Sequence, residues 1–539
     1  MADAVAEVWD VSATTVVIGF GAAGACAALE AAAGGSVLVL DRFLGGGATK
    51  LSGGVVYAGG GTEAQRAAGV SDDPEAMFDY LRHEVADAVS EPTLRRFCEG
   101  SVADLEWLAG HGVPFAGSLC PDKTSYPTNR HYLYYSGSES SGWGRRLARP
   151  AARGHRVVGR GTSGRVLYQR LAEAVARRGI GVLAQTTARE LVLDPAGRVT
   201  GVRCTTMTTA PPAVRGLHRW LARAGAKPFL YAPALGRALF RQADRLERRY
   251  AKELLVRAER GVVISAGGFI ADRALVHEHA PAYRGGLPLG TPGDDGAGLR
   301  LGLAAGGVAD RLDRLSAWRF VSPPTALISG LLVDRAGRRI CDESRYGAAV
   351  GEAIITRSEG AAWLLLDAGL IRTALRQLRR QTLWFQRVQA LYLLTVARVS
   401  APTLAQVAER AGVDPVGLRA TVQAHLDALQ EGKDDPMGKP AELVRAIERP
   451  PYSLIDVSVR PRMGYPCPML TLGGLVVDED TGQVRNAIGS SIPGLYAAGR
   501  SAVGLCSTSY VSGLSLADCV FSGRRAGRHV VATDLAEQG

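Results

Sequence analysis

Several features that would assign a chain to a particular class are missing from this sequence of 539 residues. The eight cysteines are dispersed and none belongs to a CxxC pair, so we expect neither a disulfide scaffold nor a zinc site, and we predict no bound metal. No apolar run approaches the roughly 20 residues of a membrane span. The opening segment, MADAVAEVWDVS, lacks the basic and then apolar pattern of a secretory signal, so we expect a cytoplasmic protein.

Composition places the chain among folded globular proteins. Hydrophobic residues make up 47% and charged residues 21%, which excludes wholesale disorder. At about 100–200 residues per domain, the length predicts two or three domains. Lysine and arginine outnumber aspartate and glutamate by 63 to 52, a formal net charge of +11. A positive charge of this size is compatible with binding to nucleic acid, with binding to an anionic membrane, or with neither. The net charge alone does not distinguish these three possibilities.

The first motif is a nucleotide-binding fingerprint, GFGAAG, at residues 19–24. It follows a β-branched run typical of a buried parallel strand and opens an alanine-rich helix, which is the context that this motif requires. Gly19 makes the tight turn, Gly21 lets a pyrophosphate approach the backbone, and Gly24 permits close packing of the helix on the strand. The helix N-terminus, which includes Ala22 and Ala23, supplies N–H groups to the phosphates.

A second strand, SVLVL, ends at Asp41, which would accept hydrogen bonds from a ribose, and Arg42 is assigned to the same site. A simple NAD domain would continue its alternation of strands and helices here, but a long loop rich in Gly, Ser and Thr follows instead. Such a loop suits a larger cofactor whose far end lies over exposed backbone N–H groups. We assign to it Gly46, Gly47, Thr49, Ser52, Gly53 and Gly54.

Seven motifs, the fingerprint and six later segments, resemble the fumarate reductase/succinate dehydrogenase flavoprotein superfamily and occur in its order. The later segments are VVISAGGF at 262–269, TPGDDGAG at 291–298, LVDRAGRRICDESRY at 332–346, LGGLVVD at 472–478, IPGLYAAGR at 492–500 and a closing helix within 509–527. The resemblance implies bound FAD, held also by Ala266, Gly267, Gly268, Asp295, Gly499, Arg500, Ser515 and Leu516. Many members have Glu where Arg500 stands, so its role differs from the family pattern.

The resemblance also implies the fold: an α/β protein with a discontinuous Rossmann-like FAD domain and an α+β capping domain. The FAD domain would span 1–284 and 451–539, and the cap 285–450, with the substrate in a cleft between them. Some branches of the family attach FAD through a histidine near the glycine-rich loop. Since no histidine precedes residue 83, we predict non-covalent FAD.

Departures from the family pattern bear on the substrate. Fumarate reductases hold two carboxylates with Arg and His, but this chain has Leu470 and Tyr510 at those places, and Tyr346 stands where the family's relay has Arg. An anion needs charge-assisted donors to offset its desolvation, whereas tyrosine hydroxyls suit a neutral carbonyl on an apolar body. The pattern resembles the 3-ketosteroid dehydrogenase branch, and is more similar to its Δ4-(5α) members than to its Δ1 members.

The chemistry of that branch predicts a role for each residue. The Tyr510 hydroxyl and the backbone N–H groups of Ser512 and Gly513 would hold the 3-keto oxygen and stabilise the developing enolate. Tyr346 would remove the α proton while a hydride leaves the β carbon for flavin N5, and Ser453 would relay the proton. Four tyrosines, at 126, 132, 134 and 135, would line the pocket floor or simply pack there.

Two alternatives remain open beside a 3-ketosteroid dehydrogenase. One is a reductase of the same fold acting on another enone or unsaturated acid, and the other is a flavin electron-transfer subunit. The electron acceptor would be a quinone or another oxidant.

The positive charge is concentrated in two segments that depart from the family spacing. Residues 205–260 carry +8 and residues 371–398 carry +6, and both contain interspersed aromatic side chains. Basic amphipathic stretches of this kind favour peripheral contact with an anionic membrane, but they also suit packing within the domain or against another subunit. We see no nucleic-acid motif and expect no nucleic-acid partner.

Overall fold

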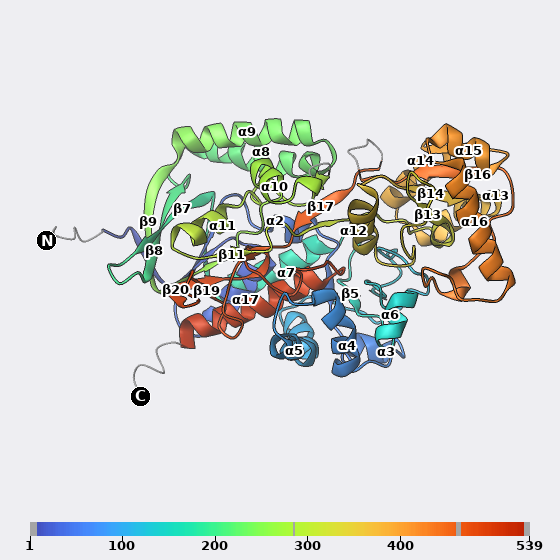
Figure 1. Ribbon diagram of the computed structural model, residues 1–539. Coiled ribbons are helices and arrows are strands. Elements are labelled where there is room, and N and C mark those ends of the chain that lie inside the picture. Colours follow the sequence, from blue (N-terminus) through green and yellow to red (C-terminus); the bar gives the residue numbers. More distant parts are fainter. Residues whose placement is uncertain (1–7, 284–285, 460–464, 533–539) are drawn as a thin grey trace.

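The computed structural model describes residues 8–283, 286–459 and 465–532 (Figure 1). It has two lobes, which we call the nucleotide lobe and the cap lobe. The nucleotide lobe is built on an eight-stranded sheet, and the cap lobe on a four-stranded antiparallel sheet with helices α12–α16 around it. The proposed boundary at 284/285 falls on residues outside the described part.

The central sheet of the nucleotide lobe has the order β19-β20-β9-β1-β2-β6, with β8 and β7 continuing from β9. Strands β20, β9, β1, β2 and β6 are parallel, and the inner strands β1 and β2 are mostly buried, as expected for a parallel sheet. The strands span β1 Val11–Ile18, β2 Val37–Asp41, β6 Gly181–Ala184, β7 Thr186–Leu193, β8 Val199–Thr206, β9 Lys252–Ile264, β19 Gln483–Arg485 and β20 Ser491–Ala497.

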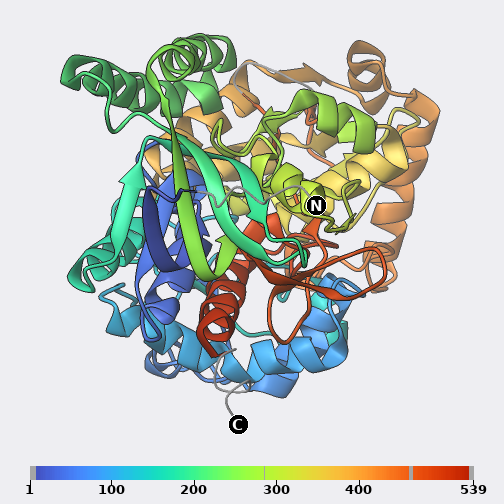
Figure 2. The same ribbon diagram turned by 90° about the vertical axis from the view of Figure 1, so that its left-hand side faces the viewer.

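The first and last helices of the chain pack against each other beside this sheet. Helix α1 (Ala22–Ala31) follows the fingerprint, and α17 (Leu514–Ala532) closes the fold. A Cβ added at Gly523 would lie 2.5 Å from the Ala23 carbonyl oxygen, so glycine permits the close approach of the two helices. Figure 2 shows α17 beside the N-terminal elements of the lobe. The contact joins two parts of the nucleotide lobe that are distant in sequence.

The cap sheet has the order β13-β14-β16-β15. Its strands are β13 Leu331–Val333, β14 Trp363–Leu366, β15 Arg398–Ala401 and β16 Tyr452–Asp456, and its helices are α12 Gly347–Ser358, α13 Ala368–Gln381, α14 Trp384–Thr395, α15 Leu404–Ala411 and α16 Pro415–Gln430. Because β16 pairs with β14 and β15, the cap sheet extends past residue 450, where the sequence had suggested a return to the FAD domain.

Smaller elements connect and surround the two lobes. The short strands are β3 Val55–Tyr57, β4 Leu133–Tyr134, β5 Gly154–Arg156, β10 Leu287–Pro288, β11 Ala309–Asp310, β12 Leu315–Ala317, β17 Pro468–Thr471 and β18 Gly474–Leu475. The remaining α-helices are α2 Gly47–Leu51, α3 Glu63–Ala67, α4 Pro74–Val85, α5 Glu91–Gly110, α6 Gly142–Leu147, α7 Gly164–Arg177, α10 Arg273–His279 and α11 Ala297–Ala304. In the described part of the chain, no helix is long and apolar enough to cross a bilayer.

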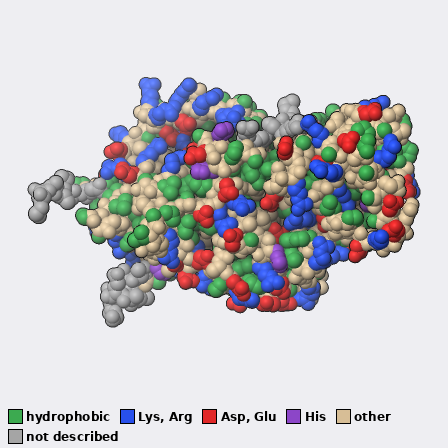
Figure 3. All heavy atoms as spheres, viewed as in Figure 1, with side chains coloured by type: hydrophobic (Ala, Val, Ile, Leu, Met, Phe, Trp, Pro, Cys, Tyr) green, Lys and Arg blue, Asp and Glu red, His purple; other side chains and the backbone are tan. Residues whose placement is uncertain are grey.

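The first basic segment forms an antiparallel pair of helices, α8 (Pro212–Tyr231) and α9 (Pro233–Tyr250). A proline near the start of each helix suits a position where no intrahelical N–H bond is required. The proposed limits 205–260 were too wide, since they include the end of β8 and more than half of β9. Leu254 and its neighbours in the proposed segment therefore lie in a strand. Figure 3 shows Lys and Arg side chains gathered over this helix pair.

Candidate active site

A cavity of about 760 Å³ runs between the lobes, lined by residues from Ile18 to Cys519. Of the residues assigned to FAD, all but Gly24, Gly46, Gly268 and Gly499 line it. Of those assigned to catalysis, Tyr346, Tyr510, Ser512 and Gly513 line it. The fold thus brings residues that are nearly 500 positions apart in the sequence to one cavity.

The glycines of the fingerprint differ in their surroundings as the motif predicts. Gly19 has φ +100°, and a Cβ there would lie 2.5 Å from the Ser265 carbonyl oxygen. At Gly24 a Cβ would lie 1.9 Å from the Gly19 carbonyl oxygen, so this glycine serves helix–strand packing. At Gly21, by contrast, only Thr49 Oγ1 comes within 4 Å, at 3.4 Å. Gly21 therefore faces open cavity, which leaves room for a pyrophosphate at the helix N-terminus.

Two neighbouring groups hold the fingerprint in place and are themselves already bonded. The Asp41 carboxylate accepts the backbone N–H groups of Phe20, Phe43 and Gly45, at 2.9–3.0 Å. A carboxylate has about four acceptor positions, and three of those of Asp41 are occupied. Asp41 can therefore accept about one further hydrogen bond from a ribose. Thr49 Oγ1 accepts the N–H of Ala22 at 3.0 Å, so this N–H is not free for a phosphate.

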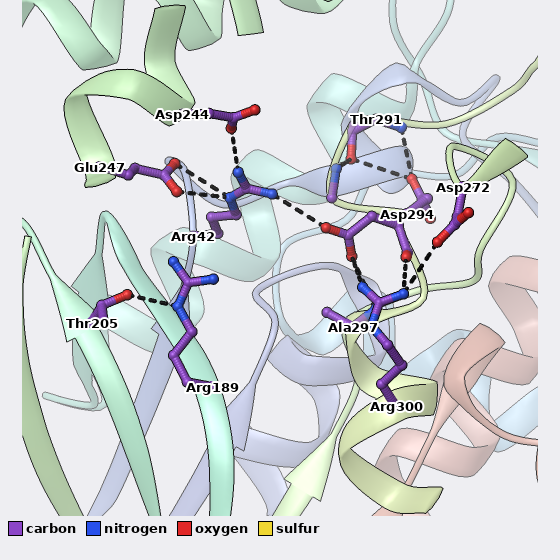
Figure 4. A network of polar contacts seen from close by, with 12 residues as sticks. Arg42, Arg189, Thr205, Asp244, Glu247, Asp272, Thr291, Asp294, Ala297 and Arg300 are labelled. Atoms are coloured by element: carbon purple, nitrogen blue, oxygen red, sulfur yellow. Dashed lines mark hydrogen bonds and ion pairs between the residues drawn. The ribbon is translucent and has the colours of Figure 1, made fainter. Parts of the chain in front are cut away.

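Arg42, next to Asp41, lies at the centre of an ionic network that joins three segments (Figure 4). Its guanidinium contacts Asp244 and Glu247 on α9, and Asp295, the last residue of the TPGDD segment, at 3.2 Å. Burial alone would lower the pKa of Arg42, but the Glu247 and Asp244 carboxylates raise it above its ordinary value. Glu247 also bonds His218 of α8 at 3.0 Å. The helix pair is thereby anchored to a residue of the cofactor cavity.

A second ion pair involves the neighbouring acid, Asp294. Arg500 bonds the buried Asp294, and Asp294 in turn accepts the N–H of Thr291 at 2.7 Å. The other terminal nitrogen of Arg500, Nη1, is buried and has no hydrogen-bond partner in the described structure. A buried, unpartnered guanidinium nitrogen on a cavity wall is suited to a polar ligand, because leaving it unpaired is costly. Together with the space at Gly21, it shows that the residues present fit a dinucleotide.

The N-terminus of α17 borders the same cavity, which Ser512, Gly513, Ser515 and Leu516 line. The Ser512 carbonyl oxygen is held by Ser136 Oγ at 3.0 Å, and the Gly513 carbonyl oxygen by the Tyr57 N–H at 3.0 Å. The N–H groups of Ser512 and Gly513 make no hydrogen bond with any described residue. Ser515 and Leu516 lie in the first helical turn, whose N–H groups lack intrahelical acceptors. This end of the helix offers fixed donors to an oxyanion or a flavin edge.

Aromatic rings surround these donors. The ring centroids of Tyr346 and Tyr510 are 6.3 Å apart, and Trp318 lies 4.8 Å from Tyr510. Burial raises the pKa of both tyrosines, and for Tyr346 the nearby Tyr510 raises it further while a hydrogen bond with Ser512 opposes the rise. Both phenols therefore keep their protons at neutral pH.

Ser512 connects the tyrosines to a further hydroxyl. Its Oγ lies 3.2 Å from the Tyr134 hydroxyl, and the pKa of Tyr134 is also raised by burial. Ser512 thus forms a hydrogen bond with Tyr134 and also lowers the pKa of Tyr346. The aromatic cluster at 126–135 indicated Tyr134 only as one of four candidates for the pocket floor. Its pairing with Ser512 depends on contact between β4 and the start of α17, which the sequence does not show.

Ser453 does not join this chain. It is fully buried in β16, its Oγ lies 2.9 Å from Ser400 Oγ, and it does not line the cavity. Ser453 is therefore not in a position to relay a proton from the cavity, although the sequence had predicted this role. Glu343, three residues before Tyr346, is also buried away from the cavity, where it bonds Arg339 and Lys439 at 2.7 and 2.9 Å.

Charge is distributed unevenly along the cavity. Eight charged residues line it, and all come from the nucleotide lobe or the 294–300 turn: Asp41, Arg42, Arg189, Glu190, Asp294, Asp295, Arg300 and Arg500. The end that faces the cap is lined by Trp318, Phe320, Tyr346, Phe385, Leu393, Tyr465 and Tyr510, with other uncharged residues. Among the described residues, this end has no cation to hold a carboxylate.

Comparison with known proteins agrees with this geometry. The FAD binding domain family matches residues 14–516. The chain is 36% identical to the 3-oxo-5-alpha-steroid 4-dehydrogenase of Comamonas testosteroni over 91% of this chain and 93% of that protein. It is 26% identical to the 3-oxosteroid 1-dehydrogenase of Mycobacterium tuberculosis over 90% of this chain and 92% of that protein.

Solved structures give the same result for the fold. The crystal structure of the 3-ketosteroid-Δ4-(5α)-dehydrogenase of Rhodococcus jostii, in complex with 4-androstene-3,17-dione, matches with a TM-score of 0.82 and 31% identity, covering 98% of this chain and 99% of that one. A flavocytochrome c3 fumarate reductase matches with a TM-score of 0.63 and 20% identity, covering 98% and 79%. The expected fold, of the fumarate reductase flavoprotein type, is confirmed.

Proposed function

This chain belongs to the family of FAD-binding oxidoreductases that includes 3-oxosteroid dehydrogenases, and from that premise we propose that it is itself an FAD-dependent 3-ketosteroid dehydrogenase. It would introduce a ring-A C=C bond next to the 3-keto group. The observation that carries the proposal is the uncharged, aromatic end of the cavity, where two protonated tyrosines adjoin free N–H groups. The greater identity to the Δ4-(5α) relatives favours that regiochemistry over Δ1.

The chain's own residues bind and polarise the ketone. The Tyr510 hydroxyl and the N–H groups of Ser512 and Gly513 donate to the 3-keto oxygen, which stabilises the enolate as its charge develops. These donors are held rigidly, since Ser136 and Tyr57 hold the carbonyl groups of the same turn. FAD, when bound, accepts at N5 the hydride that leaves the β carbon. A quinone or another oxidant would take up the two electrons released in this dehydrogenation.

The α proton leaves through Tyr346 and the hydroxyl chain behind it. Because burial raises the pKa of Tyr346, a resting phenolate is not available as the base. Tyr346 therefore takes the α proton as it passes its own to Ser512, with Tyr134 next in line. This arrangement assigns to Ser512 and Tyr134 the relay that the sequence analysis had assigned to Ser453.

We also propose that FAD is bound without a covalent link. No histidine lines the cavity among the described residues. Acid precipitation of the purified protein should then leave the flavin in the supernatant. Flavin that stays with the pellet would contradict this part of the proposal.

Anaerobic mixing with a panel of 3-ketosteroids tests the function directly. A 5α-saturated 3-ketone should bleach the oxidised flavin and give a Δ4 product by mass spectrometry and NMR. Bleaching by a 4-en-3-one with a 1,4-diene product would show Δ1 chemistry instead. If no 3-ketosteroid bleaches the flavin, the proposal is wrong. If another enone or an unsaturated acid then oxidises the chemically reduced flavin, the protein is a reductase. If the reduced flavin reacts only with protein or quinone acceptors, the protein is an electron-transfer subunit.

A further inference from the structure

Helix α14 has two faces with different surroundings. Its inner face, with Phe385, Gln389 and Leu393, lines the cavity at the end where the steroid is proposed to bind. Its outer face exposes 75% of Trp384, 62% of Val388 and 40% of Leu391. These three residues recur at i, i+4 and i+7, so they form one apolar stripe along the helix. A single helix, about 10 Å in diameter, thus separates the cavity from an exposed apolar surface.

The neighbouring helix α13 adds positive charge to this surface. Arg372, Arg376, Arg379 and Arg380 are exposed along it, and Leu375 between them is also exposed. Residues 371–398 contain six arginines and no acidic residue. None of the four exposed guanidinium groups has a carboxylate within ion-pair distance among the described residues. An apolar stripe beside unneutralised arginines is the pattern of helices that lie in the headgroup region of a bilayer.

We propose that the outer face of α13 and α14 docks this protein on an anionic lipid bilayer. The proposal deepens the proposed function and rests on it for its purpose: a 3-ketosteroid partitions into bilayers, and the docked face would place that reservoir one helix away from the cavity. A second copy of the chain fits less well, because an isologous contact would oppose two arginine clusters of like charge. A bilayer of anionic lipid instead supplies both apolar depth and negative headgroups.

The helix pair α8–α9 provides a matched control surface. It too is basic, and it exposes Trp220 at 58% and Leu217 at 48%. It lies over the nucleotide lobe, away from α13 and α14 (Figures 1 and 2). If positive charge alone caused membrane binding, both surfaces would bind the bilayer. The proposal predicts binding only by the face of α13 and α14, beside the end of the cavity where the steroid is proposed to bind.

The charge requirement is tested by co-sedimentation of the full-length holoenzyme with vesicles. One variant carries Arg376→Gln, Arg379→Gln and Arg380→Gln on α13, and its control carries Arg241→Gln, Arg245→Gln and Arg249→Gln on α9. Wild type should bind phosphatidylglycerol vesicles at low salt and not phosphatidylcholine vesicles. The α13 variant should lose affinity about a hundredfold, and the α9 variant less than threefold. Equal losses in both variants, or no binding by wild type, would overturn the proposal.

The apolar requirement is tested by quenching of tryptophan fluorescence with brominated lipid in the same vesicles. Wild type should be quenched, Trp384→Phe should lose most of the quenching, and Trp220→Phe should keep it. Loss with Trp220→Phe and not with Trp384→Phe would place the contact on α8 and overturn the proposal. If the face of α13 and α14 instead binds an acidic protein, the brominated lipid will not quench the tryptophan fluorescence, and the proposal is wrong.

The two proposals fail independently. Vesicle binding is measured without steroid, so docking stands even where no 3-ketosteroid bleaches the flavin. Steroid turnover in detergent without any vesicle binding would leave the proposed function intact and remove the docking surface. None of the substituted arginines lines the cavity, so all variants should turn over soluble steroid at the wild-type rate.

Discussion

Tyr510 makes the proposed contact with the ketone that can be removed most cleanly. Tyr510→Phe deletes one hydroxyl and keeps the ring that packs on Trp318 at 4.8 Å. Removing one donor of an oxyanion site costs about 10²–10³-fold in kcat, so we expect a loss of that size in single-turnover reduction of the flavin. Flavin content, read from the absorbance spectrum, should stay at the wild-type level. Unchanged turnover would remove Tyr510 from the mechanism.

Two buried serines, Ser512 and Ser453, test the hydroxyl relay because they have different partners. Ser512→Ala should slow flavin reduction strongly, because it breaks the path from Tyr346 to Tyr134. Ser453→Ala, the matched control, removes a hydroxyl that bonds Ser400 and no other side chain among the described residues, and should leave the rate within about twofold. Tyr134→Phe should show part of the Ser512 effect. The reverse order of effects would restore the relay to Ser453 and contradict the assignment.

Glu343 is a buried carboxylate whose pairing with Arg339 and Lys439 predicts a structural role. Burial would raise its pKa, but Lys439 and Arg339 lower it to about 2. A carboxyl whose pKa is lowered by folding stabilises the fold above its unfolded pKa, near 4.3, and that stabilisation is lost as the pH falls through about 2. At neutral pH it amounts to about 3 kcal/mol.

Glu343→Gln should therefore lower the free energy of unfolding by about 3–5 kcal/mol, since it leaves Lys439 buried without its partner. Chemical denaturation at pH 7 and at successively lower pH measures this, and the difference between variant and wild type should shrink below about pH 4. The control Glu431→Gln removes an exposed ion pair with Lys433 and should change stability by less than about 1 kcal/mol. A stable Glu343→Gln protein with altered turnover would favour a catalytic role.

At the scale of elements, the α8–α9 pair is anchored at Glu247, which bonds both Arg42 and His218. Glu247→Gln should loosen Arg42 at the cavity wall and raise the dissociation constant of FAD about tenfold, measured by flavin fluorescence on dilution. Glu253→Gln, an exposed acid of β9, is the control and should leave the constant unchanged. An unchanged constant in Glu247→Gln would show that the helix pair does not support the cofactor.

Regular elements were predictable where local pattern determines them. The run TTVVI became β1, the alanine-rich run after the fingerprint became α1, and PVGLRATVQAHLDAL became α16, because periodicity and flanking glycine or proline suffice there. The contacts of Arg42 and the pairing of Ser512 with Tyr134 were not predictable. Both join segments more than 200 residues apart, and no pattern within either segment encodes the partner.

Across the whole molecule, the cavity is bordered by both parts of the discontinuous nucleotide lobe and by the cap. A ligand bound there contacts only the folded arrangement, so it stabilises the fold by mass action. Each tenfold rise of free FAD above its dissociation constant should add about 1.4 kcal/mol to the free energy of unfolding. Thermal unfolding followed by flavin fluorescence should therefore shift upward stepwise with added FAD.

The variant Gly21→Trp is the control for the expected rise of the unfolding temperature with added FAD. A Cβ at Gly21 meets only Thr49 Oγ1, at 3.4 Å, and Gly21 lines the cavity, so we expect the indole to occupy cavity space. The variant should fold, purify colourless and unfold at a temperature that does not respond to FAD. Its far-UV circular dichroism should match that of the wild-type protein stripped of flavin. A yellow Gly21→Trp protein, or a wild-type unfolding temperature that ignores FAD, would contradict the placement of the cofactor at this helix N-terminus.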